Sequence, residues 1–321
     1  MPEPVIRPAR LEDAEMASDV MTAAYPALPA DPVLTRYHWK HPKDEWRTER
    51  FIAQVDGEPI ALLGWSHGPW DRLPERNCNV EVWLHQAWLE AERLTTLWDW
   101  IGTGAQEDGA LVLEAQVVED EREMLEALDR LGYKRDRIEK VWELDLQKHA
   151  KRLLAEARAA LAKARTAGIE IMTLADWQDP DSLKMVHSLA ELTRRDIPAS
   201  YPILPQTFEN FLQRMSSPDR RQDRFWVAVD AGKPVALSFL IFPPVRGQVW
   251  TGYTGCHPDY RGRGLARAVK LQTLSQAIEL GIPSVVTDND SENAPMLHIN
   301  ESLGYDRRTG FVTLVKRVRS E

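Results

Sequence analysis

The stretch that decides the fold runs from Thr254 to Ala266 and reads TGCHPDYRGRGLA. A strand-like run ends here, a glycine-rich loop follows, and an apolar stripe with helical spacing begins at Leu265. Free backbone N–H groups at the start of a helix attract anions, and glycines let an anion approach the backbone closely. Arg261, Arg263 and Arg267 add positive charge. The sequence matches neither the Walker loop nor GxGxxG, but the arrangement predicts a pyrophosphate site.

The segments around this loop predict alternating strands and helices. Helices are expected near residues 181–195, from Gly264 to about Gly281, and over residues 294–302. In the second of these, Gln272, Gln276 and Glu279 are expected on a face away from the apolar stripe. Strands are expected at Phe225–Val229, Val235–Phe242, Gln248–Cys256, Ser284–Asp288 and Phe311–Arg317. This order predicts an α/β fold with a mixed, partly antiparallel sheet and flanking helices.

The chain contains an internal repeat. MLEALDRLGY at residues 124–133 matches MLHINESLGY at residues 296–305, and His85 and His257 are separated by the same offset. FIAQVDGEP from Phe51 matches FWVAVDAGKP from Phe225, and the beginnings of the two halves are also alike. Four blocks in the same order indicate two tandem domains of one kind.

A helix-forming segment separates the repeats. Residues 147–168 read QKHAKRLLAEARAALAKARTAG, and Gly168 suits a helix C-terminus. We therefore expect a first domain over residues 1–146, a helical linker over 147–168 and a second domain over 169–321.

The second repeat resembles the GNAT superfamily, the Gcn5-related N-acetyltransferases. Their cofactor loop, Q/R-x-x-G-x-G/A, is matched by Arg261, Gly264 and Ala266, and the family's closing LGF-like segment by Leu303 to Tyr305. A subgroup pattern, T-x-N-x-x-x-N-x-x-M-L-x-x-N, matches from Thr287 to Asn300. The tandem layout is similar to that of the mycothiol synthase group, in which one repeat is degenerate.

The resemblance implies an acetyl-CoA site and its residues. Main-chain amides of residues 261–267 would hold the CoA pyrophosphate, and the end of the preceding strand would pair with the pantetheine arm. Asn293, at the start of a helix, would contact the cofactor. The implied cofactor-binding residues are Thr254, Gly255, Cys256, Arg261, Gly262, Arg263, Gly264, Leu265, Ala266, Arg267, Asn289, Asn293 and Met296.

Two departures from the family pattern concern catalysis. Asn300 stands where many GNAT enzymes carry the Tyr that acts as general acid, so we expect Asn300 to hydrogen-bond the leaving thiolate. The strand that precedes the loop carries no acid, so the general base is left unassigned.

The first repeat lacks the features of the cofactor loop. At the repeat offset, Arg261 to Gly264 becomes Leu89 to Glu92, and two carboxylates replace the two glycines. Like charge would repel a pyrophosphate there. We therefore expect a degenerate first domain without a cofactor site.

Composition excludes several function classes. The net charge of −9 argues against nucleic acid, and no apolar run could span a membrane. The two cysteines, Cys78 and Cys256, fit a reducing compartment, and no metal-ligand cluster is evident. We expect a cytoplasmic monomer or homodimer without a metal.

These observations predict an enzyme that moves an acetyl group from acetyl-CoA to the amine of a small-molecule acceptor by direct attack. A non-catalytic acyl-CoA-binding or regulatory protein is the alternative, because the usual Tyr and Glu are missing. Cys256 is interpreted as a strand residue and His257 as structural. Glu191, Asp196 and Tyr201 are interpreted as solvated side chains near the substrate loops.

Overall fold

In the computed structural model, which describes residues 3–318, the strands form one twelve-stranded sheet in the order β1-β2-β3-β4-β5-β12-β6-β11-β10-β9-β8-β7. The sheet is mostly antiparallel, with parallel pairing between β4 and β5 and between β10 and β11. The strands are β1 Val5–Pro8, β2 Arg47–Val55, β3 Glu58–His67, β4 Asn77–Leu84, β5 Val112–Val118, β6 Lys134–Asp145, β7 Ile169–Thr173, β8 Phe225–Asp230, β9 Lys233–Ile241, β10 Trp250–Cys256, β11 Ser284–Asp290 and β12 Asp306–Arg317. The predicted mixed α/β class is confirmed.

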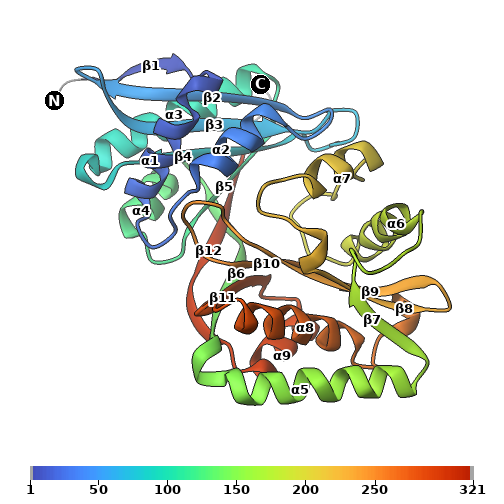
Figure 1. The fold of residues 1–321 in the computed structure, drawn as a ribbon. Coiled ribbons are helices and arrows are strands. Elements are labelled where there is room, and N and C mark those ends of the chain that lie inside the picture. Colours follow the sequence, from blue (N-terminus) through green and yellow to red (C-terminus); the bar gives the residue numbers. More distant parts are fainter. Residues whose placement is uncertain (1–2, 319–321) are drawn as a thin grey trace.

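The last strand of each repeat crosses into the other repeat. β6 pairs with β11 of the second repeat, while β12 pairs with β5 of the first. The two exchanged strands also pair with each other, and β12 carries the end of the chain into the first half of the molecule (Figure 1). Because both repeats supply strands to the middle of the sheet, their relative placement is fixed by backbone hydrogen bonds rather than by a flexible tether.

Helices cover both faces of the first half. α1 (Ala14–Ala24) and α2 (Pro32–Lys40) lie on one face, where Ala17 and Val20 pack against Ile52 and Leu62. α3 (Ala91–Glu107) and α4 (Arg122–Arg130) lie on the other face and form a core with alternate residues of β3, β4 and β5. This alternation is the pattern expected of a strand buried on both sides.

The second half repeats this arrangement. α6 (Ser182–Arg194) and α7 (Phe208–Met215) pack on one face, against Val227 and Leu237. α8 (Leu265–Glu279), α9 (Ala294–Leu303) and α5 (Leu146–Thr166) cover the opposite face of the sheet (Figure 1). α5 is the helix predicted between the repeats.

The position of α5 overturns one expectation about α8. Gln272 was expected on a face away from the core, but it is buried and donates to the carbonyl of Ala157 on α5 at 3.0 Å. The helix between the repeats lies along α8 and covers its second side, so α8 is buried on two faces. Amphipathic periodicity cannot reveal such a partner, because it reports only the stripe that faces the sheet.

The two histidines of the internal repeat have the same structural role. His85 and His257 each precede a short 3₁₀ turn, and each ring accepts a hydrogen bond from the N–H two residues later. Their own N–H groups donate to Ile60 and Val235 at 2.9 and 2.8 Å. These equivalent contacts support the duplication, and they match the structural interpretation of His257.

Candidate functional site

A gap opens between two parallel strands of the second repeat. Within residues 3–318, the ladder between β10 and β11 is limited to Trp250 opposite Val286, after which the strands diverge. In the first repeat the equivalent strands stay paired for longer, from Asn77 opposite Val112 to Val80 opposite Ala115. Backbone N–H and C=O groups that face such a gap are free to pair with an inserted chain that carries amide groups.

The wider end of the gap meets the loop predicted to bind pyrophosphate. Gly262 and Gly264 have φ of +75° and +81°, and a Cβ placed on either would meet open space. Gly264 is also the N-cap residue of α8 and, as a glycine, supplies no capping side chain to this helix. The loop therefore presents free backbone donors to solvent, as an anion site requires.

The three arginines predicted at this loop lie around it, and each already contacts another side chain of the protein. Arg261 pairs with Asp196 and donates to the carbonyl of Cys256 at 3.3 Å, and it is half exposed. Arg263 stacks on Tyr260 at 4.7 Å. Arg267 is paired with Glu156 of α5 at 2.6 Å. The first turn of α8 places Leu265 in the core and Ala266 partly buried beside the loop.

β10 forms one wall of the gap. Its pairing with β9 is irregular between Thr251 and Tyr253, and a Cβ on the intervening Gly252 would overlap the Phe239 ring at 2.2 Å. Thr254 shares a 2.9 Å hydrogen bond with Ser238, and Gly255 leaves no room for a side chain beside Thr193. Burial raises the pKa of the Cys256 thiol, which keeps it protonated and fits its interpretation as a strand residue.

β11 and the start of α9 form the other wall. Asn293 caps α9 by accepting from the Met296 N–H at 3.4 Å, and both side chains are partly exposed. Asn300 lies deeper and is completely buried. Its amide donates to Asn289 Oδ1 at 2.5 Å. Asn289 occupies one of the two N–H donors of this amide, so a direct bond from Asn300 to a leaving thiolate would have to use the other.

Two charged residues accompany this amide pair and were not anticipated from the sequence. Lys270 of α8 is completely buried and donates to Asn300 Oδ1 at 2.8 Å. Burial lowers the pKa of Lys270 to about 7, against a smaller opposing effect of Asp288. Burial of the carboxyl group raises the pKa of Asp288, although part of its side chain reaches solvent.

The corresponding loop of the first repeat is filled by its own side chains. α3 begins after Glu90, which lies 3.5 Å from Arg93, and Glu92 stands in the first helical turn. Carboxylates at a helix N-terminus satisfy the dipole that the second repeat leaves open.

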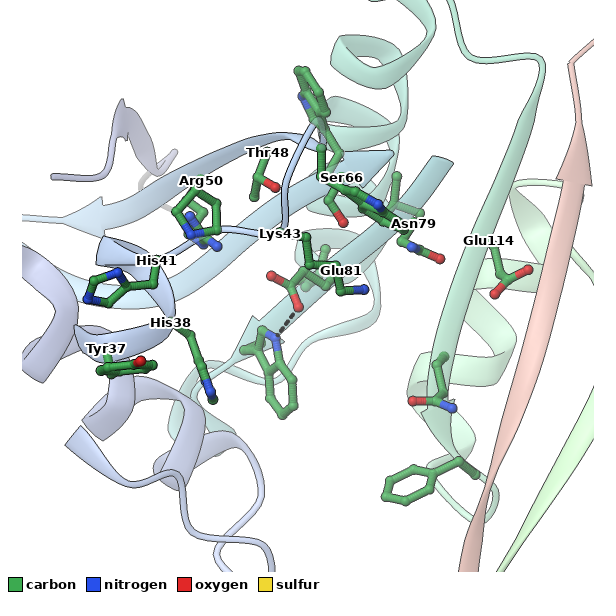
Figure 2. A pocket seen from close by; sticks show the side chains of 18 of the residues that line it. Tyr37, His38, His41, Lys43, Thr48, Arg50, Ser66, Asn79, Glu81 and Glu114 are labelled. Carbon is green, nitrogen blue, oxygen red and sulfur yellow. Dashed lines mark hydrogen bonds between the residues drawn. The ribbon is translucent and has the colours of Figure 1, made fainter. Parts of the chain in front are cut away.

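Two neighbouring cavities lie on the face of the sheet that carries α2, α6 and α7. The larger, which we call the inter-repeat cavity, has a volume of about 690 Å³ and is lined by both repeats. Figure 2 shows side chains that the first repeat contributes to it, from Tyr37 to Glu114. The smaller, of about 290 Å³, lies under residues 197–207 and ends at Asp290. Residues that line both cavities include Lys43, Trp46, Glu114, Glu139, Arg214 and Thr313.

A row of acidic side chains extends from the gap into these cavities. Glu139 of β6 lies opposite Asp290 of β11 in the ladder. Burial raises the pKa of Glu139 to about 7, and the nearby Asp288 adds to the shift. Burial likewise raises the pKa of Glu114 to about 7, and one of its oxygens is buried without a hydrogen bond. Asp290 is neutralised by Arg137 at 2.7 Å.

Comparison with known proteins identifies this architecture. Residues 186–305 match the model of the acetyltransferase (GNAT) family. The chain is 32% identical over 96 residues to an acetyltransferase of Sodalis glossinidius, covering 30% of this chain and 66% of that protein. It is 31% identical over 111 residues to a mycothiol acetyltransferase of Thermobifida fusca, covering 31% of this chain and 34% of that protein. The chain belongs to the GNAT superfamily.

Solved structures extend the similarity over almost the whole length of this chain. A tandem GNAT protein from the clavulanic acid biosynthesis pathway superposes with a TM-score of 0.77 at 16% identity, covering 99% of this chain and 100% of that one. A GCN5-related N-acetyltransferase from Sphaerobacter thermophilus gives a TM-score of 0.70 at 18% identity, covering 99% and 96%. The chain thus has the tandem GNAT fold, whereas the curated relatives are matched over less than two thirds of their length.

The described part of the chain contains neither a membrane-spanning helix nor a metal-ligand cluster. Between residues 3 and 318, no helix has the length and apolar character needed to cross a membrane. Over the same residues, no three His, Cys, Asp or Glu side chains come together as a metal site.

Proposed function

We propose that this protein is an N-acetyltransferase that moves an acetyl group from acetyl-CoA to the amine of a small-molecule acceptor. The observation that carries the proposal is the gap between β10 and β11, which leads to the open glycine loop at the start of α8. The gap suits a chain with amide groups, and the loop suits a pyrophosphate at its end. Acetyl-CoA combines both features and supplies an activated thioester.

The cofactor would be held by backbone groups more than by side chains. The amides of residues 261–267 would bind the pyrophosphate, and Thr254 to Cys256 would pair with the pantetheine arm. Asn293 and Met296 would contact the cofactor from the start of α9, with Asn289 behind them. In the first repeat, Glu90 and Glu92 stand at the position of the glycines, so we assign that repeat no cofactor site.

Asp288 is our assignment for the general base. It stands on β11, two residues beyond the last paired position at Val286, and its side chain reaches solvent. Its raised pKa suits proton uptake from an amine better than an ordinary carboxylate would. As the amine nitrogen bonds to the acetyl carbon, the C–S bond breaks, the thiolate leaves and Asp288 accepts the amine proton. Backbone N–H groups beside the irregular pairing of β10 would polarise the thioester carbonyl.

The proposed function divides the labour between the repeats. The second repeat would bind acetyl-CoA, while the first, through β6 and the residues of α2 and β3 to β5, would complete the acceptor side. The strand exchange supports this division, because it brings Glu139 of the first repeat beside β11.

Turnover with a broad panel of primary amines tests the proposal. Release of CoA from acetyl-CoA, with the acetylated amine identified by mass spectrometry, is the expected result for at least one acceptor. The Gly264→Glu variant serves as the control, because it should lose turnover by losing the cofactor. Tight acetyl-CoA binding without transfer to any amine would instead support the alternative of a non-catalytic acyl-CoA-binding protein.

A further inference from the structure

The inter-repeat cavity has a positive end. Lys43 follows α2 of the first repeat and Arg214 belongs to α7 of the second, and both line the two cavities. Partial burial in the cavity wall lowers the pKa of Lys43 to about 8, although its side chain also reaches solvent, and the charge of Arg214 adds to the shift. Figure 2 shows Lys43 directed into the cavity near Glu81 and Asn79.

These cations lack a fixed counterion in the described residues. Neither Lys43 nor Arg214 forms a salt bridge within residues 3–318, and the ammonium of Lys43 lies 4.0 Å from the Trp46 ring. Arg220, next along the cavity wall, has a buried Nε without a hydrogen bond. Burial and the charge of Arg214 lower the pKa of Arg220 to about 10. Lys43 and Arg214 are both exposed where they line the cavity, and like charges gathered on one cavity wall favour an anion between them.

Two acidic residues near this end offset only part of its charge. Glu81 accepts from the Trp83 indole at 3.1 Å, and the buried Asp219, with one oxygen unpaired, acts on both Arg214 and Arg220. His38, whose pKa burial lowers, and Arg50 also line the cavity. The positive side chains that line this region are Lys43, Arg50, Arg214 and Arg220.

The other end of the same space is acidic. Glu114 and Glu139 line both cavities and lead towards Asp288 in the gap. An ammonium group is attracted to this end, where the proposed base would take its proton. A volume of about 690 Å³ is within the range of small-molecule sites, so one ligand can extend between the two ends.

We propose that the acceptor is a zwitterion: besides its amine it carries a carboxylate or phosphate, which Lys43 of the first repeat and Arg214 of the second bind together. The role given to the amine rests on the proposed function. The anion site rests only on the residues that line the cavity. It also gives the first repeat a function that the loss of a cofactor loop does not remove. The acceptor pocket is complete only when the second repeat's α7 faces the first repeat.

Matched acceptors test this inference. The panel consists of ω-amino carboxylic acids and ω-aminoalkyl phosphates of increasing chain length, each beside its neutral amide or alcohol. Wild-type protein should use the anionic member of the best pair with a kcat/KM about tenfold to a hundredfold higher, as for a contact with a charged partner. Lys43→Gln and Arg214→Gln should remove most of this preference through KM, while the neutral acceptor is affected less than about twofold.

A binding measurement separates this inference from the proposed function. The unfolding midpoint of the CoA-saturated protein should rise more with the anionic member of a pair than with the neutral one. Lys40→Gln is the matched control, because this exposed lysine at the end of α2 lies outside both cavities. It should keep the full difference, whereas Lys43→Gln and Arg214→Gln should lose it.

The outcomes are distinct. An anion-dependent shift that needs Lys43 and Arg214, without acetyl transfer to any amine, would retain the anion site and reject the acetyltransferase. Equal binding and equal use of anionic and neutral members across the whole series would overturn the inference. Variants that weaken both members of each pair alike would also overturn it, since the two cations would then be structural.

Discussion

Lys270 donates a 2.8 Å hydrogen bond to Asn300, and both side chains are completely buried between α8, α9 and β11. A buried ammonium is costly unless its donors are satisfied, so Asn300 has a structural reason to be polar. The same amide holds Asn289 on β11. The residue that stands in place of the family's Tyr therefore ties the two helices to the strand that forms the cofactor gap.

Asn300→Leu is predicted to lower both stability and rate. The substitution leaves Lys270 and Asn289 without their partner, so the free energy of unfolding should fall by about 1–3 kcal/mol. The catalytic rate should fall roughly tenfold to a thousandfold, with acetyl-CoA affinity near normal, whether the amide acts on the thiolate or positions Asn289. Denaturant unfolding and steady-state kinetics measure the two effects. Full turnover in this variant would make Asn300 purely structural.

The double variant Lys270→Met/Asn300→Leu separates pairing from packing. Replacing both polar partners by apolar side chains removes the unsatisfied groups together, so the double variant should be less destabilised than the two single changes summed. A coupling energy on the order of 1 kcal/mol or more is expected from denaturant unfolding of the four proteins. Strict additivity would show that the Lys270–Asn300 bond contributes nothing to folding.

Lys270 also predicts a pH dependence of stability. Burial holds its folded pKa at about 7, below the ordinary value of 10.5, so the unfolded chain binds more protons between these values. The penalty for burying the ammonium is therefore complete below pH 7 and is relieved as the pH rises towards 10.5. Relative to Lys270→Met, wild-type protein should gain stability over this window. The exposed Lys163→Met is the control, and a parallel curve for Lys270→Met would contradict the prediction.

Gly264→Glu is predicted to abolish acetyl-CoA binding without unfolding the protein. Gly264 has a φ of +81°, so any side chain adds strain of about 1–2 kcal/mol. The charge of Glu should additionally oppose the pyrophosphate proposed to bind there, because it copies Glu92 of the first repeat. Gly264→Ala carries the strain alone and should bind far better than Gly264→Glu. Calorimetry measures acetyl-CoA affinity, and a circular dichroism melt shows whether each variant is folded. Affinity within a few-fold of wild type in the Glu variant would refute the pyrophosphate assignment.

Acetyl-CoA is predicted to bind once per chain. β10 and β11 diverge after one pair, whereas β4 and β5 stay paired over four positions and lead to Glu90 and Glu92. Isothermal titration should therefore give one site per chain. Two equivalent sites would reject the assignment of a degenerate first repeat.

The sequence predicted local features of the second repeat closely and missed what depends on the other repeat. The loop from Arg261 to Ala266 carries its own signal, because glycines and a helix start are local. The exchange of β6 and β12 has no such signal, since each strand has the same pattern whichever neighbour it pairs with. The burial of Gln272 depends on α5 and could not be found from periodicity.

The proposed acceptor site was not predicted from the sequence for a similar reason. Lys43 and Arg214 lie far apart in the chain, and nothing in their neighbouring sequence distinguishes them from solvated charges. Asp288 and Asp290 did leave a signal, because aspartate is depleted in strands and yet occurs twice in the run Thr287 to Asp290. Lys270 is a second signal of this kind, because it interrupts an otherwise apolar part of α8. A charged residue within an apolar helix or strand segment therefore predicts a buried polar partner.

The assignment of Asp288 as base predicts how the rate depends on pH. A base must be deprotonated, so kcat/KM should rise with pH through the raised pKa of Asp288, and Asp288→Asn should lose this limb together with most of the rate. The acceptor amine gives a limb of the same sign, so the wild-type profile alone cannot separate them. Lys270→Met can, because the positive charge of Lys270 lowers the pKa of Asp288, so removing it raises that pKa and leaves the acceptor unchanged. The limb should move to higher pH in this variant. The exposed Lys163→Met is the matched control and should leave the limb in place. An unmoved limb in Lys270→Met, or full activity in Asp288→Asn, would assign proton transfer to another group or to water.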